Sequence, residues 1–196
     1  FGRYKALHYY VKKAYEDILI SFERNNTIIN VYVVSDKLAD TEAILSLKLI
    51  DFEGNIINEI QKKVVIKANS SNLYFEYKIP STIDQKNNML YCELSDNKIK
   101  SSSIYYFVLP KQLDLKPTNI EIQSKKTEYG YEIALNSSYL AKNVYLDFQA
   151  EGLLEDNYFD IIPDQIKIIK FNTSEDFNNL NSKIKIMSLN DIFQSN

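Results

Sequence analysis

Residues 73–79 read Leu-Tyr-Phe-Glu-Tyr-Lys-Ile, a stretch in which side chains of two kinds alternate. Every second residue from Leu73 to Ile79 is apolar or aromatic, and the charged Glu76 and Lys78 lie between them. A period of two is typical of a strand with one buried face. Similar segments occur at residues 18–22, 28–34, 45–49, 56–67, 90–94 and 104–109. About seven short strands without intervening helices predict an antiparallel sandwich of immunoglobulin type.

A second set of strands follows a proline-bounded linker. Pro110 and Pro117 enclose residues 111–116, and two prolines so close together interrupt a strand ladder and favour an extended link. Alternation then resumes in segments at residues 120–122, 129–135, 144–148, 165–171 and 183–187, with an acidic loop at 152–163. We therefore predict an all-β chain of two immunoglobulin-like β-sandwich domains in tandem. The predicted domains are a helix over 1–16, a first sandwich over 17–110 and a second over 111–196.

The first residues have a helical rather than a strand period. Tyr4, Leu7, His8, Val11 and Tyr15 are spaced to fall on one side of an amphipathic helix of about three turns. His8 lies on this apolar face and is interpreted as a packed histidine. A second hypothesis for His8 is a contact with whatever the helix covers.

Composition excludes several classes of function. The 196 residues carry a formal net charge of -3, which gives no general attraction to nucleic acid. No apolar run approaches the ~18–20 residues of a membrane-spanning helix. The single histidine and the single cysteine exclude multi-histidine and multi-cysteine metal sites, and we expect no cofactor. The four glycines lack the spacing of a phosphate-binding loop.

A few residues remain as chemical candidates. Cys92, between Leu90 and Leu94, is interpreted as a core residue rather than a nucleophile. Acidic residues of one loop could ligate calcium, although their spacing differs from that of an EF-hand and favours a solvated turn; they are Glu151, Glu155, Asp156 and Asp160. Tyrosines could stack on sugar rings, although strand propensity and core filling are the favoured explanation; they are Tyr9, Tyr10, Tyr105, Tyr106 and Tyr158.

Several stretches together resemble one enzyme family. They are Phe-Gly-Arg-Tyr-Lys-Ala-Leu-His-Tyr-Tyr (1–10), Val-Val-Ser-Asp (33–36), Glu-Asp-Asn-Tyr-Phe-Asp-Ile-Ile-Pro (155–163) and Ser-Leu-Asn-Asp-Ile-Phe (188–193). In order and spacing they resemble the end of the catalytic barrel and the following immunoglobulin-like domains of β-mannosidases of glycoside hydrolase family two. The chain differs at Tyr4, where that family usually carries tryptophan.

The resemblance implies a piece of a longer polypeptide. Family members hydrolyse terminal β-linked mannose with retention, using two glutamates of the barrel. No position of this chain matches either glutamate, so no catalytic residue is assigned. The implied role is a non-catalytic accessory region that packs on the barrel or a neighbouring subunit, with an exported (periplasmic, extracellular or lysosomal) parent. We also expect that the helix from Tyr4 to Tyr15 supports a homodimer. The alternatives are a module that binds mannose-containing glycans, and an adhesin- or receptor-type pair unrelated to glycosidases.

Overall fold

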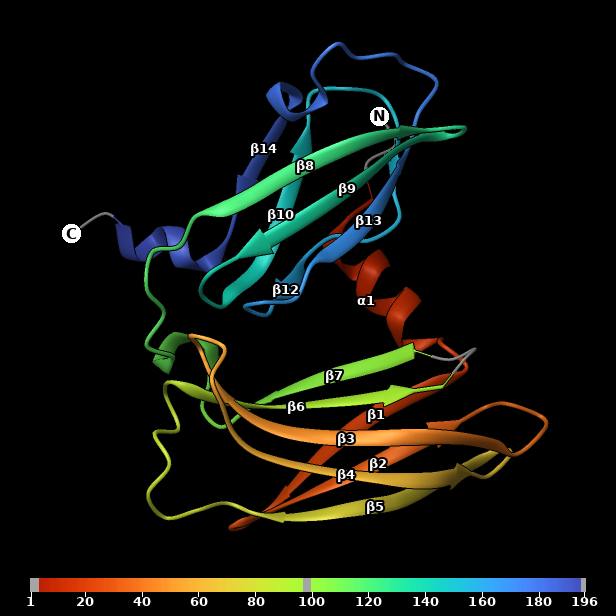
Figure 1. Cartoon of the computed structure of the whole chain (residues 1–196), viewed down its shortest axis with the longest axis vertical. Coiled ribbons are helices and arrows are strands. Elements are labelled where there is room, and N and C mark those ends of the chain that lie inside the picture. The colour runs from red at the N-terminus through yellow and green to blue at the C-terminus, as the bar shows by residue number, and fades with distance from the viewer. Residues whose placement is uncertain (1–3, 97–99, 195–196) are drawn as a thin grey trace. The chain divides into compact units, whose positions relative to one another are not determined.

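Over residues 4–96 and 100–194, the computed structural model contains one α-helix and fourteen β-strands, with three short 3-10 helices (Figure 1). The strands form two separate compact units. The first unit comprises residues 14–51 and 55–114. The second comprises residues up to Lys13, the turn Phe52–Gly54 and residues from Leu115 onward. Each unit has its own hydrophobic core.

The first unit is a sandwich of two antiparallel sheets. One has the order β1-β2-β5 and the other the order β4-β3-β6-β7. The strands are β1 (Ile18–Asn25), β2 (Ile28–Ser35), β3 (Thr41–Asp51), β4 (Ile56–Ile66), β5 (Ser70–Lys78), β6 (Asn88–Ser95) and β7 (Lys100–Tyr106), followed by a 3-10 turn at Pro110–Gln112. Alternate residues of β2 are buried, among them Ile29, Val31 and Val33. The period of two therefore orients one face of this strand into the core.

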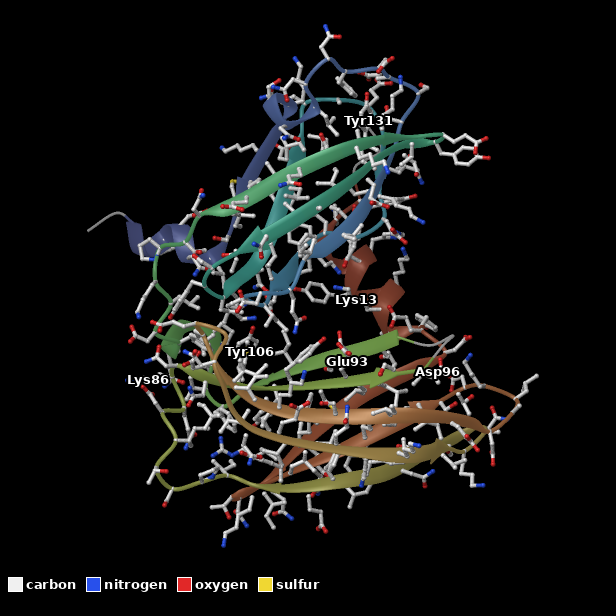
Figure 2. The ribbon with its side chains drawn as sticks, viewed as in Figure 1. Lys13, Lys86, Glu93, Asp96, Tyr106 and Tyr131 are labelled. Carbon is white, nitrogen blue, oxygen red and sulfur yellow. The ribbon has the colours of Figure 1, made fainter. Side chains whose placement is uncertain are left out.

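The second unit is a smaller sandwich with a helix packed on it. Its sheets have the orders β11-β13-β9-β8 and β12-β10-β14. The elements are α1 (Ala6–Ala14), β8 (Ile120–Thr127), β9 (Gly130–Ser137), β10 (Ala141–Phe148), β11 (Leu153–Leu154), β12 (Phe159–Ile161), β13 (Lys167–Asn172) and β14 (Ile184–Met187), with 3-10 helices at Leu180–Lys183 and Leu189–Gln194. Tyr131 on β9 belongs to the core of this unit (Figure 2). Its hydroxyl donates a hydrogen bond to Asp176, in the loop after β13, at 3.1 Å.

A buried asparagine fixes the closing segment of the second unit. Asn190 is fully buried, and its amide donates to the carbonyl oxygens of Lys116 (2.7 Å) and Leu140 (2.9 Å). Its side-chain oxygen accepts from the backbone of Lys142 at 2.9 Å. A buried amide that pairs three backbone groups avoids the cost of leaving them unsatisfied.

The predicted fold class is confirmed: an all-β chain with two immunoglobulin-like sandwiches and one helix near its beginning. Two details differ. The stretch predicted as an acidic loop contains the short strands β11 and β12, whose two or three residues are too few to show a period. The helix spans Ala6–Ala14 rather than Tyr4 to Tyr15. Residues 1–3 of the first resemblance segment lie outside the described residues.

Candidate interaction site on helix α1

Helix α1 has two faces of different character. At 3.6 residues per turn, Tyr9 and Lys13 lie on one side, and Leu7 and Val11 lie on the opposite side. Tyr9 is the one α1 residue with a buried side chain. The face around Tyr9 and Lys13 therefore holds the helix against the second sandwich.

Aromatic packing contributes to this attachment. Tyr9 is only 5% exposed, and its ring centre lies 6.2 Å from that of Tyr158, in the segment before β12. Tyr158 in turn stacks on Tyr145 of β10, with ring centres 4.8 Å apart. Burial, together with the neighbouring Tyr158 and Asp156, raises the pKa of Tyr9, so its hydroxyl stays neutral. The three rings form a continuous apolar contact between helix and sandwich.

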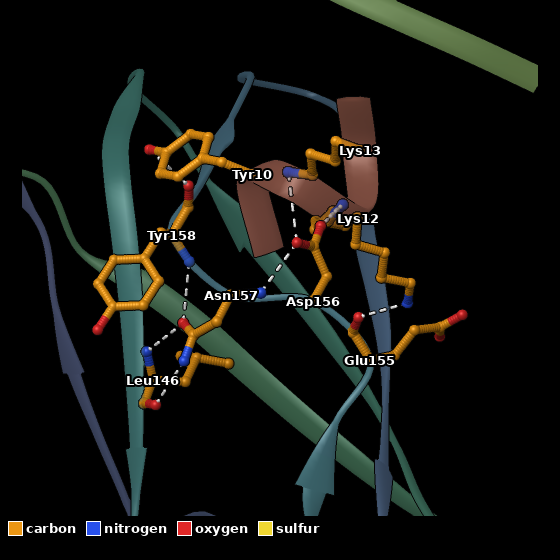
Figure 3. Close-up of polar contacts among 9 residues, drawn as sticks. Tyr10, Lys12, Lys13, Leu146, Glu155, Asp156, Asn157 and Tyr158 are labelled. Carbon is orange, nitrogen blue, oxygen red and sulfur yellow. Dashed lines mark hydrogen bonds and ion pairs between the residues drawn. The ribbon is translucent and has the colours of Figure 1, made fainter. Parts of the chain in front are cut away.

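Three polar contacts hold the same face (Figure 3). The Lys12 ammonium donates to the carbonyl oxygen of Glu155 at 2.9 Å. The Tyr10 hydroxyl donates to the carbonyl oxygen of Tyr158 at 3.4 Å. Lys13 forms an ion pair with Asp156, with nitrogen and oxygen 3.3 Å apart. All three partners belong to the segment 155–158, which we call the receiving segment.

Asp156 is the most constrained charge of the receiving segment. Its side chain is 14% exposed and pairs with both Lys13 and Lys167 of β13, the latter at 2.8 Å. Burial disfavours the carboxylate, but the two ammonium groups more than offset this and hold its pKa below the ordinary value. Asp156 thus links the helix to the sheet by one shared carboxylate.

Asn157 keeps the receiving segment in place. Its side-chain oxygen accepts from the backbone nitrogen of Leu146 at 2.9 Å, and its amide donates to the Leu146 carbonyl at 3.0 Å. The side chain therefore pairs with β10 as a neighbouring strand would. The next residue, Tyr158, has a left-handed backbone with φ 60. This turn directs the Tyr158 carbonyl towards Tyr10 of α1 (Figure 3).

The opposite face of α1 is exposed. We call Tyr4, Leu7, His8 and Val11 the outer stripe. Leu7 is 72% exposed and Val11 is 43% exposed, and the ring of Tyr4 stacks on His8 with centres 3.8 Å apart. The interpretation of His8 as a packed histidine was wrong, because its side chain is exposed. The sandwich instead takes the side with Tyr9 because the receiving segment supplies acceptors for Lys12 and Lys13.

The cavity beside α1 is small. It measures about 40 Å³ and is lined by residues of α1, β10 and the following loop, among them Tyr9, Tyr145 and Asp147. This volume suits about one water molecule and is too small for a sugar ring. Of the tyrosines considered for stacking, the structure brings Tyr9, Tyr10 and Tyr158 together here. Tyr105, on β7, packs instead against Phe22 and Phe107.

The other chemical candidates lie apart. Cys92 is fully buried in β6, and burial raises the pKa of its thiol to about 12. Asp160 pairs with Lys142 at 3.1 Å, whereas Asp156 pairs with Lys13 and Lys167. Within residues 4–96 and 100–194, no group of three His, Cys, Asp or Glu residues is placed to hold a metal ion. In the same residues no helix is long and apolar enough to cross a membrane.

Two domain families match nearly the whole chain. A model described as a mannosidase Ig/CBM-like domain matches residues 27–112, and one described as an Ig-fold domain matches residues 115–192. A β-D-mannosidase from Dictyoglomus thermophilum superposes with a TM-score of 0.85 at 25% identity, over 93% of this chain and 23% of that one. The two sandwiches belong to these two domain families, and over both of them the chain resembles β-mannosidases. An Amycolatopsis orientalis exo-chitosanase shares the fold, with a TM-score of 0.65 at 13% identity over 93% of this chain and 26% of that one.

Curated relatives of this chain are much longer than it is. Beta-mannosidase A from Aspergillus terreus is 26% identical over 89% of this chain and 21% of its own length. The same protein from Neosartorya fischeri gives the same values. The chain thus corresponds to the immunoglobulin-like portion of such proteins and spans about a fifth of their length. Sequence reasoning missed Lys12, Lys13 and Lys167, because nothing in the sequence pairs them with residues 155–156.

Proposed function

We propose that the chain is the non-catalytic accessory region of a β-mannosidase-type glycoside hydrolase. The family assignment of both sandwiches and the named relatives support this role. The candidates for chemistry support it too, since Cys92 is a buried neutral thiol and the acids at 156 and 160 are each paired with lysine. One alternative, a receptor-type pair unrelated to glycosidases, does not account for the match to mannosidase domains.

The outer stripe of α1 is the observation that best supports this proposal. The helix is fixed to the second sandwich through Tyr9, Lys12 and Lys13, yet it presents Leu7 and Val11 to solvent. A short helix anchored on one face with apolar residues on the other is suited to bridge two bodies. Because the chain spans about a fifth of its relatives' length, the partner we propose is a catalytic domain on the same polypeptide.

Hydrolysis of a chromogenic β-mannoside tests the proposal directly. Two proteins are assayed side by side: the 196-residue chain alone, and the longer polypeptide that contains this chain together with the proposed catalytic domain. We expect the longer polypeptide to release the chromophore and the chain alone to release none. Activity of the chain alone would contradict the accessory role, and an inactive longer polypeptide would contradict the parent activity.

Variants of the outer stripe test the docking surface. In the longer polypeptide, Leu7→Lys should lower the temperature at which β-mannosidase activity is lost, because it places a charge in the proposed contact. Leu38→Lys is the matched control, since Leu38 is an exposed leucine of the first unit. Equal thermal inactivation of the two variants would refute docking through α1.

A further inference from the structure

Strand β4 is a long and open edge. It pairs with β3 and ends the sheet order β4-β3-β6-β7, and among the described residues no strand pairs with its other side. All of its residues except Val64 and Ile66 are exposed. Ile57 and Val65 are 54% and 47% exposed. Unpaired edges of this length are templates for pairing with another chain.

The backbone groups that face this open edge can be identified. The Tyr74 hydroxyl of β5 donates to the carbonyl oxygen of Val65 at 3.0 Å, so this carbonyl is bonded by a group outside β3. Backbone groups of alternate residues in a strand point to opposite edges. Glu59, Gln61 and Lys63 therefore share the outward direction of Val65.

The sequence of these outward residues is complementary to itself. We infer that β4 is a self-association edge, which pairs antiparallel with β4 of a second copy of this chain about Gln61. In this register Gln61 lies opposite its own copy, and Glu59 lies opposite Lys63 twice, once on each side. The register of β4 is irregular at Ile57, and the Val65 carbonyl already bonds Tyr74, so the complementary stretch is residues 59–63. Opposite charges directly across an antiparallel ladder stabilise it.

Neighbouring registers lose this complementarity. Centring the pair on Glu59 or on Lys63 would place like charges opposite each other, which is destabilising. Centring it on Ile60 or Lys62 would leave the charges at 59 and 63 without an opposite charge across the new ladder. Charge complementarity thus selects the register about Gln61.

The remaining charge of the strand is turned away from the edge. The Lys62 ammonium lies over the Phe75 ring, 4.3 Å from its centre, and donates to the carbonyl oxygen of Tyr74. It is held by β5 of the same unit. Glu59 contacts Lys48 of its own sheet at 3.6 Å and retains a second carboxylate oxygen for a partner.

Cross-linking tests the register in the 196-residue chain. Gln61→Cys should give a disulfide-linked dimer under mild oxidation, because residues opposite each other at a hydrogen-bonded position have Cα atoms about 5.5 Å apart. Lys63→Cys is the control, since its two copies would be about 13 Å apart at about 3.3 Å per residue. The native Cys92 is buried and does not compete. Equal cross-linking of both variants, or of neither, would refute the register.

A charge swap tests how strongly the charged pairs stabilise the dimer. The dissociation constant of the same chain is measured by analytical ultracentrifugation. Lys63→Glu should weaken self-association about tenfold, because it creates two like-charge pairs. The double variant Glu59→Lys with Lys63→Glu should restore it. Lys78→Glu, at the exposed end of edge strand β5, makes the same charge change and should have no effect. A dimer that is insensitive to these changes but lost with Leu7→Lys would assign self-association to α1 and overturn the inference, leaving the accessory role untouched.

Discussion

Single polar residues decide how the receiving segment is held. Asn157 pairs with both backbone groups of Leu146, and Asp156 is shared by Lys13 and Lys167. Neither role is visible in the sequence, because asparagine and aspartate are equally common in solvated turns. What distinguishes these two residues is the burial that β10 and α1 impose on them. The resemblance therefore located the receiving segment, but the prediction of a solvated turn did not anticipate the ion pairs of Asp156.

The shared carboxylate should make stability depend on pH. Because the pKa of Asp156 is lowered on folding, its ion pairs stabilise the native state above the unfolded-state value near 3.8, and this contribution is lost as pH falls through the folded-state pKa. Asp156→Asn should therefore cost about 1 kcal/mol near neutral pH in urea unfolding. The difference from wild type should shrink at about pH 3. Asp164→Asn, an exposed control, should show no such trend, and a constant deficit for Asp156→Asn would contradict the ion-pair account.

At the scale of elements, strands were predictable and the helix orientation was not. Alternation from Ile28 to Val34 predicted β2, because that strand buries one face on the core of its unit. Alternation also predicted β5, although a register shift opposite Val31 and Tyr32 leaves Leu73 exposed. For α1 the helical period identified the apolar stripe but not the side of the helix that contacts the sandwich. Its apolar stripe is outward because Lys12 and Lys13 find a carbonyl and a carboxylate in residues more than 140 positions away. A helical period identifies which side of a helix is apolar, but it does not identify the part of the protein that this side contacts.

Detachment of α1 should follow from loss of one ring. Tyr9→Ala removes the only buried side chain of the helix and should lower the protection of α1 amides against hydrogen exchange by about 3 kcal/mol. Amides of β9 and β13 should keep their protection. Leu7→Ala, on the outer stripe, is the control and should leave α1 unchanged. Equal loss of protection in helix and strands would instead mean that Tyr9 supports the whole second unit.

At the scale of the whole molecule, two hydrophobic cores are assembled from separate sets of strands. Leu47 belongs to the core of the first unit and Leu135 to that of the second, and both are nearly or fully buried. A substitution that leaves a cavity destabilises the core that packed around the deleted atoms. Leu135→Ala should therefore destabilise the second unit by about 3 kcal/mol and reduce hydrogen-exchange protection in β8–β10 and β13, but not in β1–β7. Leu47→Ala should give the reverse pattern. If either variant lowered protection equally in both units, the chain would unfold as one cooperative body instead of as two.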